Sequence, residues 1–501
     1  MDRCYTYVVL NGSERPIKIN KKERVEVARI MIDNKKLGLG LLIALGIGSM
    51  IGGGIFNSPT DLIGKANPLA ALIAWGIGGT GVICLALVFQ SLANKKPDLV
   101  GGIYSYARAG FGDFLGFNSA WGYWAAGFLG NVAFFVLFFK TLNSLLGEGK
   151  GLSPMASFIM GSAMLWGFTY IVSRGTRDAG ILNAVVTAAK LIPLLLVVVL
   201  GVFLFQGANF TVPNWQNVIA ASGDTTSLAD QIKGAMGTIL WCFVGIEAAV
   251  VLSARAVSQK IVGKAIVISI FITLAIYVAV STIAMGVIDA KTLAGASTPL
   301  ADVLGATFIG GAGAVIVKLG IMISVMGATL PWIMIVSEIP FLAAKDGIMP
   351  KWFAKANKNG IPINSLLLTQ GLTQIFLLAL LTPVLQDAYY MVYYISTTLV
   401  LMPYLFSTLF STKLCLQKKS FGRDLFVSVI ATIYAMYVIY AVGVLYLGLT
   451  VVLYAIGVIP FVIARREKGQ EIKGWEWAAS AALVLGGIFM VIQIAGGNIT
   501  P

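Results

Sequence analysis

The chain has 501 residues, of which 58% are hydrophobic and only 12% are charged. Soluble domains carry about twice that charged fraction, so the composition excludes a soluble protein and indicates a membrane protein with many spans. The net charge of +14 does not indicate nucleic-acid binding, because the basic residues stand in short loops between apolar runs, where they report membrane orientation.

Cysteine and histidine usage narrows the chemistry. The four cysteines, Cys4, Cys84, Cys242 and Cys415, are scattered and form no CxxC pair, so neither a disulfide framework nor a zinc site is indicated. The chain has no histidine, and any proton chemistry must therefore use carboxylates or a desolvated lysine. We expect no metal and no cofactor.

Residues 1–36 are polar and basic, and we assign them to a cytoplasmic N-terminal tail. Apolar segments long enough to cross a bilayer core of about 30 Å follow. These predicted spans are 37–64, 67–93, 117–145, 153–173, 179–206, 228–253, 261–287, 311–344, 361–383, 387–411, 424–445, 446–464 and 474–495. The predicted fold class is an all-α polytopic membrane protein with about 12–13 transmembrane helices.

Lysine and arginine concentrate in alternate loops, which predicts the orientation. One set of loops carries several basic residues in most of its members, whereas the opposite set carries only Lys65, Lys140, Lys150, Lys233 and Lys291. The N-terminus is therefore expected inside, and a thirteenth span would put Pro501 outside.

The first span contains three consecutive glycines, Gly52–Gly54. Three glycines in a row remove the side chains that hold a helix together. Backbone at bilayer depth can give up helical hydrogen bonds only where it is buried in protein or lines a wet cavity. We predict a broken helix whose free N–H groups bind an anionic group. The alternative is close helix packing of the GxxxG kind.

The third and fifth spans each carry polar groups at depth. Tyr123 and Asn131 are eight residues apart on one face of the third span, and Asn131 offers a neutral amide. Lys190 stands about eleven residues into the fifth span. Desolvation would make Lys190 a usable proton carrier; alternatively, its ammonium replaces a bound sodium ion and pins the first and eighth spans. We favour a structural or coupling cation over a substrate contact.

The sixth span has a second interruption, where Gly245 and Glu247 stand in place of lipid-facing residues. Interruptions five spans apart, at matching places of two inverted repeats, point to a midplane substrate site. Glu247 could bind a cation, relay a proton or only tie helices together, and we favour coupling or gating. Glu338, near the inner end of the eighth span, is expected to pair with a lysine there.

Two tryptophans, Trp241 and Trp332, are not near a predicted membrane interface. Pro331 weakens the helix just before Trp332. A tryptophan face turned toward a cavity is a cation–π platform for a guanidinium or an ammonium group. Core packing is the alternative for each.

Three stretches together resemble the amino acid–polyamine–organocation superfamily: 48–56 (GSMIGGGIF), 101–108 (GGIYSYAR) and 240–247 (LWCFVGIE). The likeness covers nearly the whole chain and is greatest to the basic amino acid/polyamine antiporters, especially the arginine–ornithine antiporters. It implies a LeuT-like five-plus-five inverted-repeat core at 37–411, with repeats 37–206 and 228–411 and discontinuous helices 1 and 6. The residues 424–501 would then be additional C-terminal spans.

The resemblance also implies roles for individual residues. Backbone groups at Gly52–Gly54 take the substrate carboxylate and carbonyls around Trp241–Val244 take its amine, while Trp241 covers the substrate and Tyr123 is a gating partner. The substrate-binding residues expected in this way are Ile51, Gly52, Gly53, Gly54, Asn131, Trp241, Phe243, Val244 and Trp332, and the gating or coupling residues are Tyr123, Lys190 and Glu247.

The chain departs from some relatives in two places. Related arginine–agmatine antiporters have a serine where this chain has Gly53 and an apolar residue where it has Lys190. Proton-coupled amino acid transporters of the superfamily have a lysine at the second position. The coupling mode is therefore left open.

The leading hypothesis is a secondary transporter in the cell membrane that exchanges arginine for ornithine by alternating access. Its partners are small amino acids and the lipid bilayer, and a homodimer is left open. The alternatives are a proton-coupled symporter in which Lys190 titrates, an antiporter of lysine or another amine pair, and a sensor that binds an amino acid without moving it. An enzyme is disfavoured, since the chain has no histidine, metal cluster or carboxylate pair on one helix.

Overall fold

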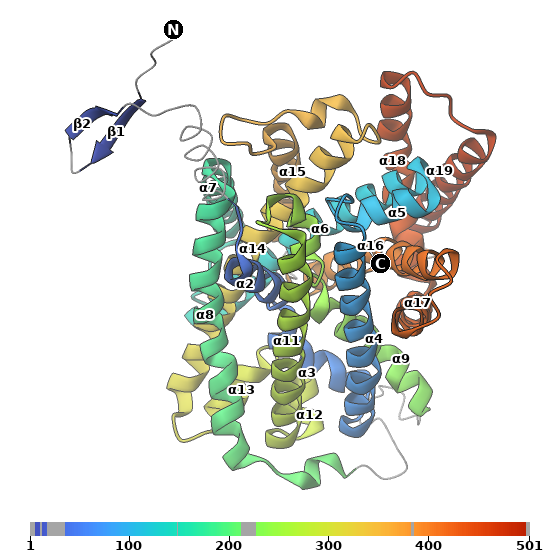
Figure 1. The fold of residues 1–501 in the computed structure, drawn as a ribbon. Helices are drawn as coiled ribbons and strands as arrows, with labels where there is room; N and C mark the ends of the chain where they lie inside the picture. Colours follow the sequence, from blue (N-terminus) through green and yellow to red (C-terminus); the bar gives the residue numbers. More distant parts are fainter. Residues whose placement is uncertain are drawn as a thin grey trace.

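Apolar stretches form helices in this chain because a helix at bilayer depth satisfies its own backbone polar groups. The structure, a computed structural model, describes residues 6–10, 13–17, 36–147, 149–211, 227–381 and 385–496. Most of the predicted tail 1–36 and the C-terminal Pro501 therefore lie outside the described residues. Figure 1 shows the helices grouped into one body.

The elements of the first half include an antiparallel strand pair followed by helices. They are β1 (Thr6–Leu10), β2 (Ser13–Ile17), α2 (Leu39–Met50), α3 (Gly54–Ile63), α4 (Pro68–Lys95), α5 (Ile103–Phe111), α6 (Asp113–Leu146), α7 (Pro154–Arg174), α8 (Thr176–Gly201), η1 (Val202–Leu204) and η2 (Gly207–Phe210). The η elements are short 3₁₀ turns.

The regular elements of the described second half are all helices. Its elements are α9 (Leu228–Phe243), α10 (Ala248–Val251), η4 (Leu252–Arg255), α11 (Gln259–Val287), α12 (Ala290–Gly295), α13 (Pro299–Gly305), α14 (Gly310–Lys345), η5 (Lys351–Ala354), α15 (Ile363–Phe376), η6 (Leu377–Leu381), α16 (Leu385–Gln417), α17 (Arg423–Val442), α18 (Val444–Glu467) and α19 (Gly474–Ala495).

The membrane spans agree with the sequence prediction. Among the described residues, 12 helices are long and apolar enough to cross a bilayer, and the bent pair α9 and α10–η4 makes up to 13. The predicted boundary between the spans 424–445 and 446–464 lies close to the observed one, since α17 ends at Val442 and α18 begins at Val444. The all-α polytopic fold class is confirmed, while the division into two repeats stays a prediction.

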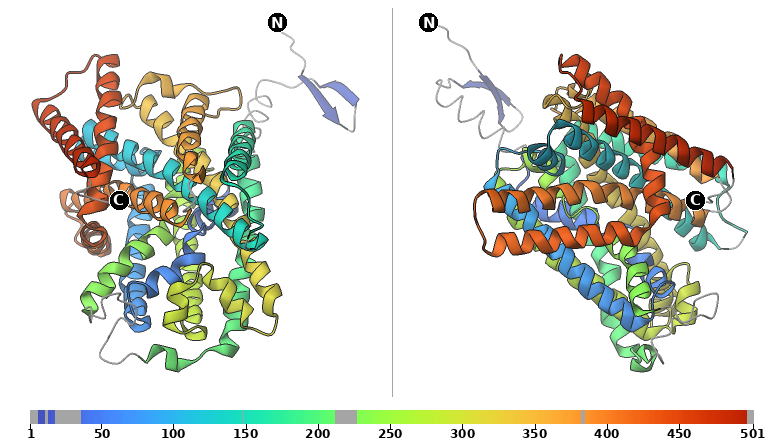
Figure 2. Two further views of the ribbon diagram at one scale, coloured as in Figure 1. Left: turned by 180° about the vertical axis from the view of Figure 1, so that it is seen from behind. Right: turned by 90° about the vertical axis from the view of Figure 1, so that its right-hand side faces the viewer.

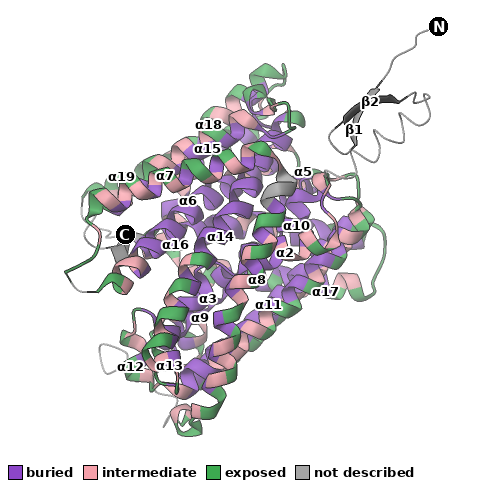
Figure 3. Ribbon diagram, turned by 90° about the vertical axis from the view of Figure 1, so that its left-hand side faces the viewer, coloured by how far each residue is buried: buried purple, intermediate pink, exposed green. Residues whose placement is uncertain are grey.

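The centre of the molecule is built from α6 and α14. The most apolar windows of these two helices are 89% and 83% buried, whereas that of α19 is 17% buried. Figure 2 shows α17, α18 and α19 gathered at one side of the body, and Figure 3 shows buried residues concentrated on the inner helices. The C-terminal helices therefore cover one flank of a core that they do not form.

Ion pairs between helices gather at the end of the molecule that holds the basic loops. Arg255 donates to Glu338 at 2.8 Å, Arg108 to Asp113 at 2.8 Å, and Arg465 to Glu476 at 2.7 Å. The partner of Glu338 is therefore an arginine and not the predicted lysine. The planar guanidinium explains the choice, because Arg255 donates two N–H groups to one carboxylate oxygen and a third bond to the carbonyl of Gly360.

The close approach of α6 to α14 generates a stability prediction. A Cβ atom on Gly127 would lie 1.7 Å from Val336 Cγ1, and a β-branched side chain in a helix has little rotamer freedom with which to move away. Gly127→Ala should destabilise the protein by about 1–3 kcal/mol through overpacking. The measurement is the thermal melting temperature in detergent.

The matched control is Gly167→Ala on α7, where a Cβ atom would meet nothing within 4 Å. This substitution should leave the melting temperature unchanged or raise it, since alanine favours a helix by roughly 0.5–1 kcal/mol over glycine. Equal effects of the two variants would contradict the close contact.

Candidate functional site

The first span is broken near its middle, as predicted. α2 ends at Met50 and α3 begins at Gly54. The N–H of Gly52 bonds to the carbonyl of Met50 at 2.8 Å, only two residues back, so the helical bonding pattern has ended. Among the described residues, the N–H groups of Gly53 and Gly54 donate to no other backbone group. They stand at the N-terminus of α3, where free N–H groups and the helix dipole favour an anion.

The second break lies in the sixth span, between Phe243 at the end of α9 and Ala248 at the start of α10, and bends the span by 43°. Gly245 has φ +113°, and a Cβ atom there would lie 2.9 Å from the backbone of Ser49. Only glycine both adopts this positive φ readily and leaves room for the backbone of Ser49. The two breaks therefore touch each other, and the Ser49 hydroxyl donates to the carbonyl of Gly245 at 3.0 Å.

The carbonyls at the second break differ in how much of their bonding capacity is used. The carbonyl of Trp241 accepts a bond from the N–H of Val244 at 3.2 Å, and that of Phe243 accepts one from Ile246 at 3.1 Å. Among the described residues, the carbonyl of Val244 accepts no backbone bond. It stands just past the C-terminus of α9, where the helix dipole favours a cation.

A cavity lies between the two breaks. Its free volume is about 10 Å³, the space of roughly one water molecule. Its walls are formed by Ser49, Met50, Gly52, Gly53, Gly54, Ala126, Gly130, Phe134, Trp241, Val244, Trp332 and Ser396. Helices far apart in the sequence meet here: α2, α3, α6, α9, α14 and α16. The site therefore exists only once the whole core is folded.

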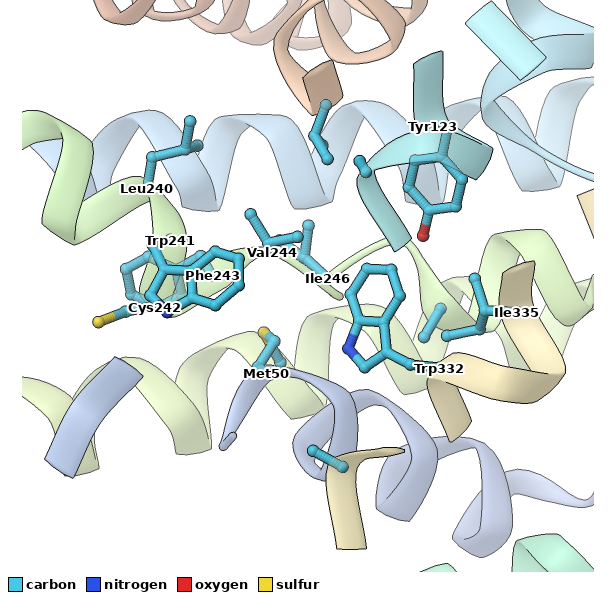
Figure 4. Close-up of a cluster of buried hydrophobic side chains, with 14 of the residues drawn as sticks. Met50, Tyr123, Leu240, Trp241, Cys242, Phe243, Val244, Ile246, Trp332 and Ile335 are labelled. Carbon is cyan, nitrogen blue, oxygen red and sulfur yellow. The ribbon is translucent and has the colours of Figure 1, made fainter. Parts of the chain in front are cut away.

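The two predicted tryptophans both line this cavity, and Figure 4 shows them on either side of Met50 and Val244. The ring of Trp241 lies 4.9 Å from that of Tyr393, at 89°. A Cβ atom on Gly54 would lie 2.8 Å from the Trp241 ring, so this indole covers the start of α3. The indole N–H of Trp332 donates to the carbonyl of Ser49 at 3.2 Å.

Three predicted substrate-binding residues, Ile51, Asn131 and Phe243, do not line the cavity. Asn131 is fully buried, and both of its polar side-chain atoms lack a hydrogen-bond partner within the described chain. Asn131 directly follows the lining residue Gly130. Because one step along a helix turns the side-chain direction by about 100°, Asn131 points to a different side of α6 and not into the cavity. The ring of Phe243 packs 5.3 Å from that of Tyr277. Ile51 is fully buried, and its carbonyl is bound by other side chains.

Lys190 on α8 is fully buried and binds the broken end of α2. Its ammonium donates to the carbonyl of Gly48 at 2.6 Å and to that of Ile51. Ser324 on α14 donates to the carbonyls of Ile51 and Gly52 at 3.1 and 2.9 Å. The carbonyls that lose their helical partners are thus satisfied by side chains from two other helices.

Glu247 is fully buried beside the second break. Its carboxylate accepts hydrogen bonds from the hydroxyls of Tyr123 on α6 and Tyr404 on α16, and from the N–H of Gly245 at 3.2 Å. Three elements of the core therefore meet at one carboxylate. Tyr404 was missed from the sequence: its only signal is a tyrosine after Pro403 inside a span, and α16 holds several other tyrosines.

A family model described as amino acid permease matches residues 37–489 of the chain. The chain belongs to the amino acid permease family. The permease is 39% identical to a protein of Pseudomonas aeruginosa named arginine/ornithine antiporter, over 93% of the chain and 99% of that relative. Relatives of the same name from Latilactobacillus sakei and Lactococcus lactis are 36% and 35% identical, over 93% of the chain and 98% and 91% of their own lengths. The resemblance noted from the sequence motifs is confirmed.

The contacts of Lys190 generate a prediction about the first break. Lys190→Met keeps the length of the side chain but leaves the carbonyls of Gly48 and Ile51 without their ammonium donor. We expect a loss of about 1–3 kcal/mol in the free energy of unfolding, as for a buried polar group without a partner, and loss of amino acid uptake. Melting temperature and uptake into proteoliposomes are the measurements.

The control for this experiment is Lys318→Met. The ammonium of Lys318 on α14 donates to the carbonyl of Ser144 at 3.2 Å, away from both breaks. This variant should keep wild-type stability and uptake. Unchanged stability in Lys190→Met would show that the break does not depend on this ammonium.

Proposed function

We propose that the permease exchanges arginine for ornithine across the cell membrane by alternating access, with its N-terminus in the cytoplasm. The observation that carries the proposal is the cavity between the two breaks, which has free N–H groups on one side, a free carbonyl on the other and two indole rings in its wall. The names of the related antiporters support the choice of substrates.

The backbone groups suit the two ends common to all amino acids. The N–H groups of Gly53 and Gly54 bind the α-carboxylate, and the carbonyl of Val244 binds the α-ammonium, each at the helix end whose dipole has the favourable sign. Ile51, Phe243 and Asn131 stay in the proposal as flanking residues that gain contact when the cavity widens around a substrate. The buried amide of Asn131, without a partner in the described chain, is a ready hydrogen-bonding group for a guanidinium.

The cationic side chain is recognised by aromatic faces. Within the described chain, the cavity-lining residues include no acidic side chain. The indole of Trp332 binds the guanidinium or ammonium group by a cation–π contact of roughly 2 kcal/mol in a desolvated site. A contact of this size gives selectivity and still lets the substrate leave, as exchange requires.

Two layers close the cavity. Trp241 covers it on the side of α3, and Tyr123, Glu247 and Tyr404 close the side of α10. In the proposed orientation α10 leads to the cytoplasm, so the cytoplasmic layer opens when Tyr123 and Tyr404 leave Glu247. Alternation then means that one layer is open while the other is closed.

Proton-coupled symport is the second candidate, because the buried ammonium of Lys190 donates to two carbonyls, forms no ion pair within the described chain and could lose its proton. If Lys190 titrated during transport, a pH gradient alone would drive arginine into vesicles without internal substrate. We favour antiport because the same group stabilises the first break through two hydrogen bonds, and because the related proteins are named as antiporters.

The proposed exchange predicts that uptake depends on internal substrate. Labelled arginine should enter proteoliposomes loaded with ornithine at least about ten times faster than empty ones, because the loaded carrier returns and the empty one does not. Arginine entry that is indifferent to internal ornithine would overturn the exchange, and entry driven by a pH gradient alone would establish symport.

If the Trp332 ring binds the cation, the affinity for arginine should depend on an aromatic ring at this position. Trp332→Leu should raise the half-saturating concentration of arginine about tenfold, corresponding to a loss of about 1.4 kcal/mol, and should leave that of the neutral isostere citrulline nearly unchanged. Trp332→Phe keeps a ring but loses the N–H donated to Ser49, and it should stay close to the wild type. Equal losses for arginine and citrulline would count against the ring as the platform.

A further inference from the structure

Asp61 is a carboxylate on α3, seven residues after Gly54, and it belongs to none of the interactions described above. Its Oδ1 accepts hydrogen bonds from Asn57 Nδ2 and from the Tyr390 hydroxyl, both at 2.8 Å. Among the described residues, its Oδ2 accepts no hydrogen bond and Asp61 forms no ion pair. One oxygen is therefore held in place while the other stays available.

A tyrosine cluster on α16 stands beside this carboxylate: Tyr389, Tyr390, Tyr393 and Tyr394. Adjacent rings of the cluster have centroids 4.4–6.3 Å apart, and those of Tyr389 and Tyr393 are stacked at 9°. The side chains of Tyr389 and Tyr393 are 1% exposed, and their hydroxyls make no hydrogen bond of normal geometry among the described residues. A carboxylate next to aromatic faces and free hydroxyls has the chemistry of a cation site.

The cluster is continuous with the cavity. The ring of Tyr393 is the one that contacts Trp241, the cover of the cavity, at 4.9 Å. Tyr390, which donates to Asp61, has its ring centroid 5.5 Å from that of Tyr389 and 6.3 Å from that of Tyr393, so the carboxylate joins the cluster through this residue. Seven residues of helix separate Asp61 from Gly54 by about 10 Å and return it to the same face.

We propose that Asp61 and the tyrosine cluster form an external subsite that binds the guanidinium or ammonium group of the substrate before its backbone groups reach Gly53 and Gly54. The inference rests on the proposed function, including the orientation that puts the end of α3 outside. It adds a charge-selective step that the central cavity lacks.

Two lysines moderate this subsite. Lys140 on α6 and Lys65 just after α3 act electrostatically on Asp61 without forming an ion pair with it. Together with the two hydrogen bonds to Oδ1, they reduce the attraction of the carboxylate for a cation. A weaker attraction lets the cationic substrate dissociate from the subsite and move on to the cavity.

The experiment is Asp61→Asn in the full-length permease, a change that keeps the size of the side chain and an oxygen able to accept the bonds to Oδ1. Arginine uptake into intact cells reports the external side, and ornithine uptake into inside-out vesicles reports the internal side. The half-saturating concentration of external arginine should rise tenfold or more. The half-saturating concentration of internal ornithine should change less than twofold. The concentration of citrulline that half-inhibits external arginine uptake should also change less than twofold.

Two control variants separate recognition of the cation from other effects. Asp302→Asn on α13 removes an exposed carboxylate near Lys318 and tests the general effect of surface charge. It should leave the half-saturating concentration of external arginine unchanged. Thr60→Val on α3 breaks the bonds that the Thr60 hydroxyl donates to the carbonyls of Leu293 and Ala296 and keeps Asp61, so any effect of this variant should be equal for arginine and citrulline. If Asp61 only anchored α3, Asp61→Asn would likewise act alike on the two substrates.

The outcomes separate the two proposals. Wild-type permease that fails to exchange arginine for ornithine overturns the proposed function and the subsite with it. If the wild type exchanges arginine for ornithine but Asp61→Asn leaves the half-saturating concentration of external arginine unchanged, the subsite alone is overturned. Equal weakening of arginine and citrulline, or of both sides of the membrane, also overturns it.

Discussion

The hydrogen bonds from Lys190 to the end of α2 are the interaction on which the rest of the structure depends. A peptide group without a partner costs several kcal/mol in hydrocarbon, so a helix can stop at mid-depth only where other groups replace its bonds. Lys190, Ser324 and Tyr277, whose hydroxyl donates to the carbonyl of Met50 at 2.7 Å, supply these bonds from three neighbouring helices. The N–H groups of Gly53 and Gly54 stay free as a result.

The two breaks form one unit, since the first is packed against the second. Ser49 joins them because its hydroxyl donates to the carbonyl of Gly245, while its own carbonyl accepts the indole N–H of Trp332 on α14. Glu247, two residues after Gly245, holds α6 and α16 through Tyr123 and Tyr404. A movement of α10 therefore acts on the cavity wall directly, without a long chain of intermediates.

Features that depend on local sequence could be predicted. The spans follow from the length of the apolar runs. The breaks follow from three consecutive glycines, Gly52–Gly54, and from a glycine, Gly245, beside a carboxylate, because these combinations disfavour an unbroken lipid-facing helix. Lys190 and Glu247 were recognisable because an ionisable group at depth always needs a partner. Each of these signals is carried by a few neighbouring residues.

Features that depend on how helices meet could not be predicted. Tyr404 and Asp61 stand in spans that contain other polar residues, and only the fold shows which of these face a partner. The partner of Glu338 was misassigned to a lysine, since the choice of Arg255 depends on where η4 ends. Asn131 was identified as polar and buried, but its angle around α6 relative to Gly130 decides whether it reaches the cavity, and residue spacing gives that angle too coarsely.

The distribution of acidic groups explains how a cation carrier can be both selective and fast. Within the described chain the cavity wall has no carboxylate, and the nearby Glu247 is occupied by two tyrosines and a backbone N–H. The carboxylate with a free oxygen, Asp61, stands about two helical turns from the free N–H groups of Gly53 and Gly54. A full charge at the point of deepest binding would hold the cation through the conformational change. In the proposed scheme, charge selection by Asp61 on the approach and aromatic contact in the cavity would let the same cation be selected and then released.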